Sequence, residues 1–254
     1  ANVIPLPEAP HAPIRAHEIA FLTHAGAMLA EVREPDLLVF SAAGLANGHL
    51  VTVSRGATDE SAWTVLAYDP NGRELLRHVT TGSVPPQALL TADGRRLVVL
   101  EQPPGSGTAI VSVLAPQRRL KRHRLPGITA MTADERSSRI ALAGASVVVL
   151  LDATTGKLRW RRDEPVDFIL PDGLRFDGRR LAVVTAARDR VRERARLGLR
   201  SYRLTDGAGT YGALDEVPLG AMPTVIDVEA PAAGKRRVVL PERAIDTTIE
   251  GDAP

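Results

Sequence analysis

The sequence contains no cysteine, which excludes disulfides, thiol catalysis, iron–sulfur clusters and cysteine-ligated zinc. Aromatic residues are scarce, at 4% of 254 residues, and this disfavours sites that stack sugar rings or unpaired bases on aromatic platforms. Long apolar runs are also missing. The longest, residues 145–151, includes Ser146 and stops before Asp152, far short of the roughly 18 residues of a membrane-spanning helix. We therefore expect a soluble chain without a transmembrane segment.

Lysine is the next scarcity: only Lys121, Lys157 and Lys235 occur among 32 basic residues, so the basic charge is almost entirely arginine. The net charge is only +2, although the isoelectric point is about 9.3. Arginine presents a planar fork of donors that suits carboxylate or phosphate wherever several gather. Apolar residues make up 44% of the chain, enough for one large core or two small ones.

A repeat is the main positive feature of the sequence. Five segments share a small or acidic turn that ends in Gly or Ser, one or two polar residues, and a short β-branched run. Asn-Gly and Asp-Gly tolerate the positive φ angles of tight hairpin turns, so each segment predicts a hairpin between two strands. The apolar runs begin 47, 43, 41 and 57 residues apart, at Leu50, Leu97, Ile140, Leu181 and Val238. That spacing is typical of β-propeller blades.

We predict an all-β chain, a β-propeller of about five four-stranded blades. The expected first strands are 37–41, 87–91, 128–132, 169–176 and 223–229. Third strands are expected at 63–68, 109–114, 147–151 and 199–204, and fourth strands at 74–80, 119–125, 157–161 and 211–218. A β-sandwich, an open stack of hairpins or a larger ring remains the alternative.

The two ends of the chain complement each other. After the fifth turn only one strand, 236–240, is clear, whereas residues 18–33 read as a hairpin about Ala25-Gly26. We predict that the N-terminal and C-terminal strands share the closing blade, which would protect the terminal edges. The corresponding domain boundaries are an extended arm over 1–13, a single propeller over 14–248 and a tail over 249–254.

One segment carries a family resemblance. Val148 to Trp160, with the run Asp-Ala-Thr-Thr-Gly-Lys before the tryptophan, resembles the pyrroloquinoline-quinone-like propeller repeat. The Asp-Gly-Arg-Arg-Leu turns at 93–97 and 177–181 resemble those of YVTN-type and TolB-type propellers. Together these matches cover about a third of the chain, and they imply propeller architecture only. The quinone-dependent enzymes that share this repeat have repeated docking tryptophans and a pair of vicinal cysteines. This chain has only one other tryptophan, Trp63, and no cysteine, so we predict no quinone and no other cofactor.

No catalytic or metal-binding motif accompanies the repeat. His-Glu-x-x-His, Gly-x-Ser-x-Gly and P-loop patterns are absent, and the histidines are scattered. A non-catalytic binding scaffold is therefore favoured, with no metal. Four acids, Asp36, Asp167, Asp227 and Glu229, are candidates for the central funnel, where propeller glycosidases mount their carboxylates. A carbohydrate-active hydrolase or lyase is the alternative, and a structural subunit of an envelope assembly is a third.

The segment 188–196 holds five arginines at alternate positions, offset by Asp189 and Glu193. In one extended strand all five would share a face. We predict binding residues there and on neighbouring loops: Arg188, Arg190, Arg192, Arg194, Arg196, Asp36 and Asp167. A second basic cluster, 118–124, falls on an outer strand, where charge discourages edge-to-edge pairing.

The expected partner is a protein or an anionic surface. Nucleic acid is disfavoured because the basic clusters lack interleaved aromatics. A chain that begins at Ala1 fits a removed signal peptide, so we expect a periplasmic or extracellular protein.

Overall fold

The structure is a computed structural model that describes residues 18–22, 28–33, 37–44, 48–56, 62–116, 118–134, 137–163, 168–189, 191–232 and 234–248. Every regular element in this part of the chain is a β-strand, which confirms the all-β prediction. No helix in these ranges is long and apolar enough to cross a membrane.

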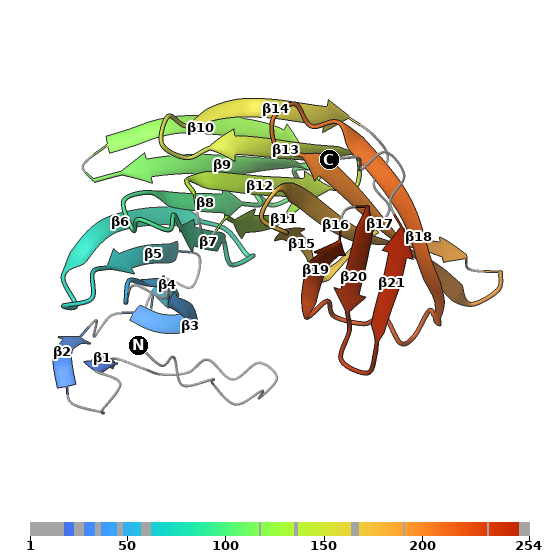
Figure 1. Cartoon of the computed structure of the whole chain (residues 1–254). Helices are drawn as coiled ribbons and strands as arrows, with labels where there is room; N and C mark the ends of the chain where they lie inside the picture. The colour runs from blue at the N-terminus through green and yellow to red at the C-terminus, as the bar shows by residue number, and fades with distance from the viewer. Residues whose placement is uncertain are drawn as a thin grey trace. The chain divides into compact units, whose positions relative to one another are not determined.

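Four antiparallel sheets each contain four strands that are consecutive in the chain, so each is a simple meander (Figure 1). The first sheet is β3 (Leu37–Gly44), β4 (Leu50–Gly56), β5 (Ala62–Tyr68) and β6 (Glu74–Thr81). The second is β7 (Gln87–Leu90), β8 (Leu97–Glu101), β9 (Thr108–Ala115) and β10 (Arg118–Pro126). The third is β11 (Ile128–Ala133), β12 (Arg139–Gly144), β13 (Val147–Asp152) and β14 (Lys157–Asp163). The fourth is β15 (Phe168–Phe176), β16 (Arg180–Asp189), β17 (Arg194–Arg203) and β18 (Gly209–Pro218).

The strands follow from the sequence pattern. Second and third strands are mostly buried, and β13 is buried from Val147 to Leu151 because both of its faces are covered. Fourth strands alternate or stay exposed, as an outer strand should. The repeated turns adopt the backbone that their glycines permit, with φ of 67° at Gly94 and 88° at Gly178.

The chain forms two compact units, residues 1–125 with 153–156, and residues 126–152 with 157–254. In the first unit, a core of Val53, Trp63, Leu97 and their neighbours joins the first and second sheets. In the second unit, one cluster centred on Leu150 and Leu181 joins the third and fourth sheets, and another joins the fourth sheet to the C-terminal strands. The predicted single domain over 14–248 stays a prediction.

Outer strands also dock on glycine turns. His123 of β10 lies with its Nε2 2.7 Å from the carbonyl oxygen of Gly156. Trp160 of β14 donates from Nε1 to the carbonyl of Leu204 at 3.2 Å, and Arg162 donates to the carbonyl of Gly207 at 2.8 Å. A Cβ at Gly207 would lie 2.7 Å from the Trp160 ring, and a Cβ at Gly156 would lie 2.7 Å from Lys121 Cβ, so both turn glycines also permit close packing.

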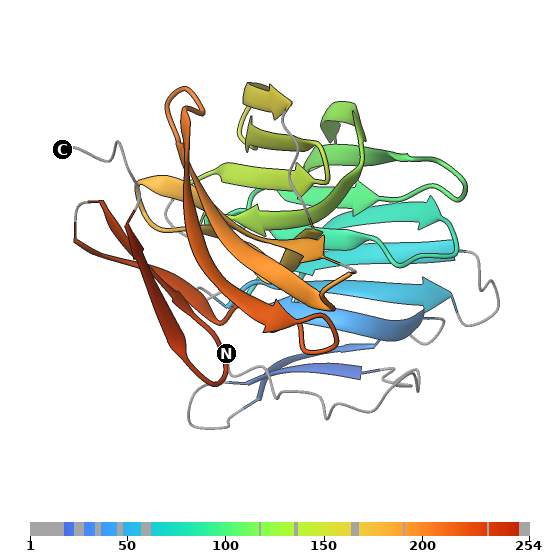
Figure 2. The ribbon, with the colours of Figure 1, turned by 90° about the vertical axis from the view of Figure 1, so that its right-hand side faces the viewer.

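The C-terminal sheet corrects one prediction. A three-stranded sheet, drawn in red in Figure 2, consists of β19 (Asp227–Ala232), β20 (Lys235–Val239) and β21 (Ala244–Thr248). The fifth repeat therefore has a third strand of its own, which the sequence did not predict. The sequence pattern missed β21 because the strand has only two apolar residues, Ala244 and Ile245, which are too few to mark a strand. The turn is closed by the Leu240 amide, which donates to the Arg243 carbonyl at 2.8 Å, and Ile245 packs on the core.

The predicted N-terminal hairpin is confirmed, but its pairing with the C-terminal strands is not. β1 (Glu18–Leu22) pairs with β2 (Met28–Arg33) in a sheet of two strands. The five-blade count and the shared closing blade are not confirmed, and both stay predictions.

Candidate functional site

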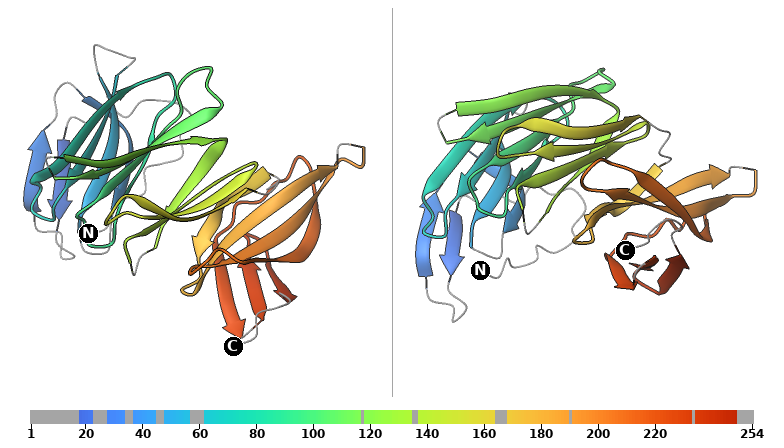
Figure 3. Two further views of the ribbon diagram at one scale, coloured as in Figure 1. Left: turned by 90° about the horizontal axis from the view of Figure 1, so that it is seen from above. Right: turned by 45° about the horizontal axis from the view of Figure 1, so that its top comes forward.

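The segment 188–196 is the end of a long β-hairpin, which we call the arginine arm. β16 and β17 pair from Arg180 opposite Arg203 to Asp189 opposite Arg194, and the described part of β15 reaches only to the level of Ala186. Figure 3 shows this hairpin in orange; β17 stays paired with β18 out to Arg194 opposite Pro218, so the arm extends past the described part of β15 but not past β18. Asp189 orders the tip, because its Oδ1 accepts the amides of Val191 and Arg192, both at 3.1 Å.

The register corrects the prediction that all the arm's arginines share one face. Arg188 lies opposite Ala195, whereas Arg194 lies opposite Asp189 and Arg196 opposite Ala187. Residues directly opposite each other share a face, so Arg188 points to one side of the arm and Arg194 and Arg196 point to the other. The single-face expectation assumed an uninterrupted strand, but the chain reverses after Asp189. Arg190 lies outside the described residues.

The ion pairs on the arm are exposed to solvent, and two of the three have N–O distances of 3.7 Å. Arg196 lies 3.1 Å and Arg194 3.7 Å from Glu216 of β18, and Arg192 lies 3.7 Å from Asp189. These three arginine side chains are 59–65% exposed. Exposed pairs of this kind contribute about 0–1 kcal/mol, so the guanidinium groups remain available to a partner. Arg188 instead lies 4.5 Å above the ring of the exposed Phe168.

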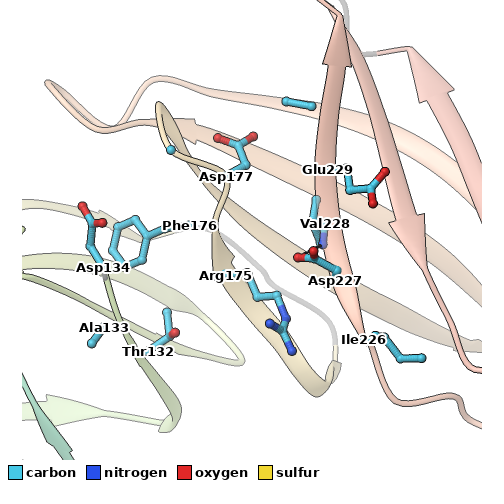
Figure 4. A pocket seen from close by; sticks show the side chains of 12 residues that line it. Thr132, Ala133, Asp134, Arg175, Phe176, Asp177, Ile226, Asp227, Val228 and Glu229 are labelled. Carbon is cyan, nitrogen blue, oxygen red and sulfur yellow. Dashed lines mark hydrogen bonds between the residues drawn. The ribbon is translucent and has the colours of Figure 1, made fainter. Parts of the chain in front are cut away.

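A cleft of about 520 Å³ opens in the second unit, where the first strands of three successive sheets meet their turns (Figure 4). It is lined by Thr132, Ala133, Asp134, Arg175, Phe176, Asp177, Gly178 and the β19 segment 226–230. The carboxylates of Asp134 and Asp177 already have partners within the protein. Asp134 accepts from Ser137 at 2.5 Å, and Asp177 lies 2.7 Å from Arg236 in a buried ion pair.

Two carboxylates of the cleft have no such partner. Asp227 and Glu229 are exposed and lie two residues apart on β19, so both are on one face of the strand. Neither has an ion pair within 4 Å among the described residues, although Glu229 lies directly opposite Arg237 in the strand pair and interacts with its charge. Arg175 donates to the carbonyls of Asp172 and Val225, which holds its guanidinium at the same cleft.

The structure brings together only part of the predicted acid set. Asp227 and Glu229 share the cleft, whereas Asp36 and Asp167 lie outside the described residues, so their convergence with Asp227 is untested. Sequence reasoning missed Arg175 and Phe176, although both directly precede a repeated Asp-Gly turn, and that position could have pointed to them. Among the described residues, no group of three or more histidines and acids is placed to hold a metal ion.

One half-buried acid in the first unit is strongly held. Glu101 at the end of β8 lies 2.8 Å from His78 Nε2 and accepts from the Thr80 hydroxyl at 3.0 Å. Burial opposes ionisation of Glu101, but the hydrogen bonds of His78 and Thr80 outweigh it and lower the pKa of the carboxyl, helped by Arg122.

No protein-family model and no curated protein sequence matches this chain. Solved structures do resemble it. The β-propeller domain of the trilobed protease from Pyrococcus furiosus, described as having an open velcro topology, is 9% identical with a TM-score of 0.50, over 85% of this chain and 83% of that one.

A protein of unknown function from Bacteroides caccae is 14% identical over 76% of this chain and 73% of its own, with a TM-score of 0.42. The C-terminal WD40 domain of Sif2 is 10% identical over 89% of this chain and 86% of its own, with a TM-score of 0.39. At these identities the likeness shows the fold alone. The chain resembles β-propeller proteins in fold, and its consecutive four-stranded sheets are blades of that type.

Proposed function

We propose that this protein is a non-catalytic β-propeller scaffold that captures an acidic protein surface with its arginine arm. The observation that carries the proposal is the ordered tip of the arm, where Val191 is 95% exposed beside exposed arginines. We further propose that the scaffold works in the cell envelope, as the sequence suggested.

The tip combines arginines, a residue type enriched in binding hot spots, with one exposed aliphatic side chain. A single aliphatic side chain fits a small apolar pocket, and the surrounding cations meet acids at the rim of that pocket. Binding should lose little conformational entropy at the arm, because the turn is already held in place. The Asp189 carboxylate accepts amides of the turn, and the Leu219 amide donates to the Glu193 carbonyl at 2.9 Å. A preorganised hairpin with an apolar tip favours a protein partner over a plain charged surface.

Site-specific photo-crosslinking of the full chain tests this function. A photoreactive amino acid at position 191, in cells that produce the protein naturally, should give one discrete protein adduct. The variant R192S/R194S/R196S should reduce the adduct about tenfold, because three exposed charge contacts of a fraction of a kcal/mol each are lost. Its melting temperature should stay nearly unchanged, since the side chains are exposed.

The matched control places the same photoreactive residue at Val84, which is 48% exposed in the first unit. It should give no such adduct. Equal adducts from both positions, or an adduct that survives the triple substitution, would show that the arm is not the capture element. The hydrolase or lyase alternative rests on Asp227 and Glu229 in the cleft, and the envelope subunit alternative rests on the fold alone.

A further inference from the structure

The outer strand of the second sheet, β10, carries a row of basic side chains that the arginine arm does not involve. Five exposed cations occupy seven positions, and the nine-residue strand has no acid. None of the five makes an ion pair with a carboxylate in the described ranges. They are Arg118, Arg119, Lys121, Arg122 and Arg124.

Several charges on the other three outer strands form ion pairs within the fold, and Arg162 of β14 donates to the carbonyls of Gly207 and Asp206. On β6, Arg77 pairs with Glu74 at 2.7 Å. On β14, Arg159 pairs with Asp152 at 3.1 Å and Arg161 with Asp163 at 2.6 Å. On β18 the acids are the paired groups: Arg243 lies 2.7 Å from Asp215, and Glu216 holds two arginines of the arm. Among the described residues, β10 therefore differs from these outer strands in that its cations form no ion pair, although the charge of Arg122 also acts on Glu101 of β8.

The position of β10 offers backbone groups as well as charge. It is the edge strand of its sheet, bonded to β9 on one side, and no described strand pairs with its other side. Its cations alternate between the two faces over about 20 Å, at about 3.3 Å per residue. Like charges this close repel one another, and an opposite charge arriving from outside relieves that repulsion.

We propose that β10 pairs with an extended acidic segment of a partner protein, which adds as a fifth strand. Its backbone would complete the unused edge, and its acids would alternate between the faces and meet the cations across the pair, at about 5 Å between Cβ atoms. The same charges repel neutral or basic strands, so the edge selects its partner. A lipid surface fits less well, because Leu125 is buried and Leu120 half-buried, which leaves β10 no apolar anchor.

Peptide binding to the full chain tests the proposal. The probe is a fluorescent peptide of about ten residues that alternates Glu and Thr, and the readout is fluorescence anisotropy. R118Q/R119Q/R122Q should weaken binding about tenfold, since three charge contacts disappear. The control R159Q/R161Q/R203Q removes three exposed arginines that already have acids as partners, so it makes the same change in net charge and should leave binding within about twofold.

Backbone pairing is tested separately from charge. Two forms of the peptide carry N-methyl groups on alternate amides, one on odd and one on even positions, and only one set of amides faces β10 in a strand pair. One form should therefore lose binding while the other keeps it. Equal binding of both forms, equal losses in the two triple variants, or no binding of the unmodified peptide would overturn the proposal. So would binding to vesicles of phosphatidylglycerol without binding to the peptide.

Discussion

A single buried ion pair connects the fourth sheet to the C-terminal sheet. Arg236 Nε lies 2.7 Å from Asp177 Oδ2, with 6% and 1% of the two side chains exposed. The other Asp177 oxygen accepts the Arg180 amide at 2.8 Å and so holds the Asp-Gly turn. The acid of the repeated turn thus acts both inside its own hairpin and between sheets.

The substitution R236Q should destabilise the protein by about 3 kcal/mol, because it leaves the Asp177 carboxylate buried without a cation. Urea unfolding measures the loss. In a double-mutant cycle, D177N/R236Q should be less destabilised than the sum of the two single variants.

The neighbouring residue supplies the control. Arg237 also pairs with an aspartate, Asp246 at 2.8 Å, but these side chains are 43% and 67% exposed. R237Q should therefore destabilise the protein much less than R236Q does. If the two variants lose the same stability, burial does not make the Arg236 pair more important for stability than the exposed Arg237 pair.

At the level of strands, the sequence was sufficient wherever a local pattern decides the structure. Turn glycines and β-branched runs located sixteen strands of the four complete sheets within a few residues, because hairpin geometry is set by neighbours in the chain. β21 was missed since its two apolar residues, Ala244 and Ile245, form no run.

The candidate sites depend on longer-range information. Which way an arginine of the arm points depends on where the hairpin reverses, and periodicity alone does not fix that position. The cleft depends on strands about 40–50 residues apart, and although Arg175 precedes a repeated turn, the sequence does not show which distant strands lie beside it. Likewise, the sequence shows the basic run on β10 but not that its charges stay unpaired while those of β14 are paired.

The docking of Trp160 on a glycine turn gives a prediction for one pair of elements, β14 and the β17–β18 turn. Gly207 has φ of 74°, and a Cβ there would lie 2.7 Å from the Trp160 ring. G207A should therefore destabilise the protein by about 2 kcal/mol or more, from backbone strain together with displacement of the indole.

Gly105 is the matched control, since its φ is 67° but a Cβ there meets nothing within 4 Å. G105A should cost only the backbone term, about 1 kcal/mol. Urea unfolding of both variants separates the two contributions. If G105A and G207A lose the same stability, the close approach of Trp160 does not limit the position.

For the whole molecule, the ionisation of carboxylates predicts how stability depends on pH. Hydrogen bonds and arginines lower the pKa of Asp206 and Asp246 at the surface. The pKa of Asp93 and Glu101 is also lowered, because hydrogen bonds outweigh the opposing effect of burial. Groups whose pKa is lower in the folded state stabilise it above their unfolded pKa, and that stabilisation is lost as pH falls through the folded pKa. The melting temperature should therefore fall progressively below about pH 5.

The variant E101Q isolates the half-buried member of this set. Near neutral pH it should melt well below the parent protein, because Gln accepts the hydrogen bonds of His78 and Thr80 without the charge. As pH falls below about 4.5 toward the lowered folded pKa of Glu101, the two melting curves should converge, since the parent then loses the same charge by protonation. E74Q, which breaks an exposed pair with Arg77, should follow the parent at every pH. A gap between E101Q and the parent that stays constant down to the lowest pH would mean that ionisation of Glu101 does not stabilise the fold.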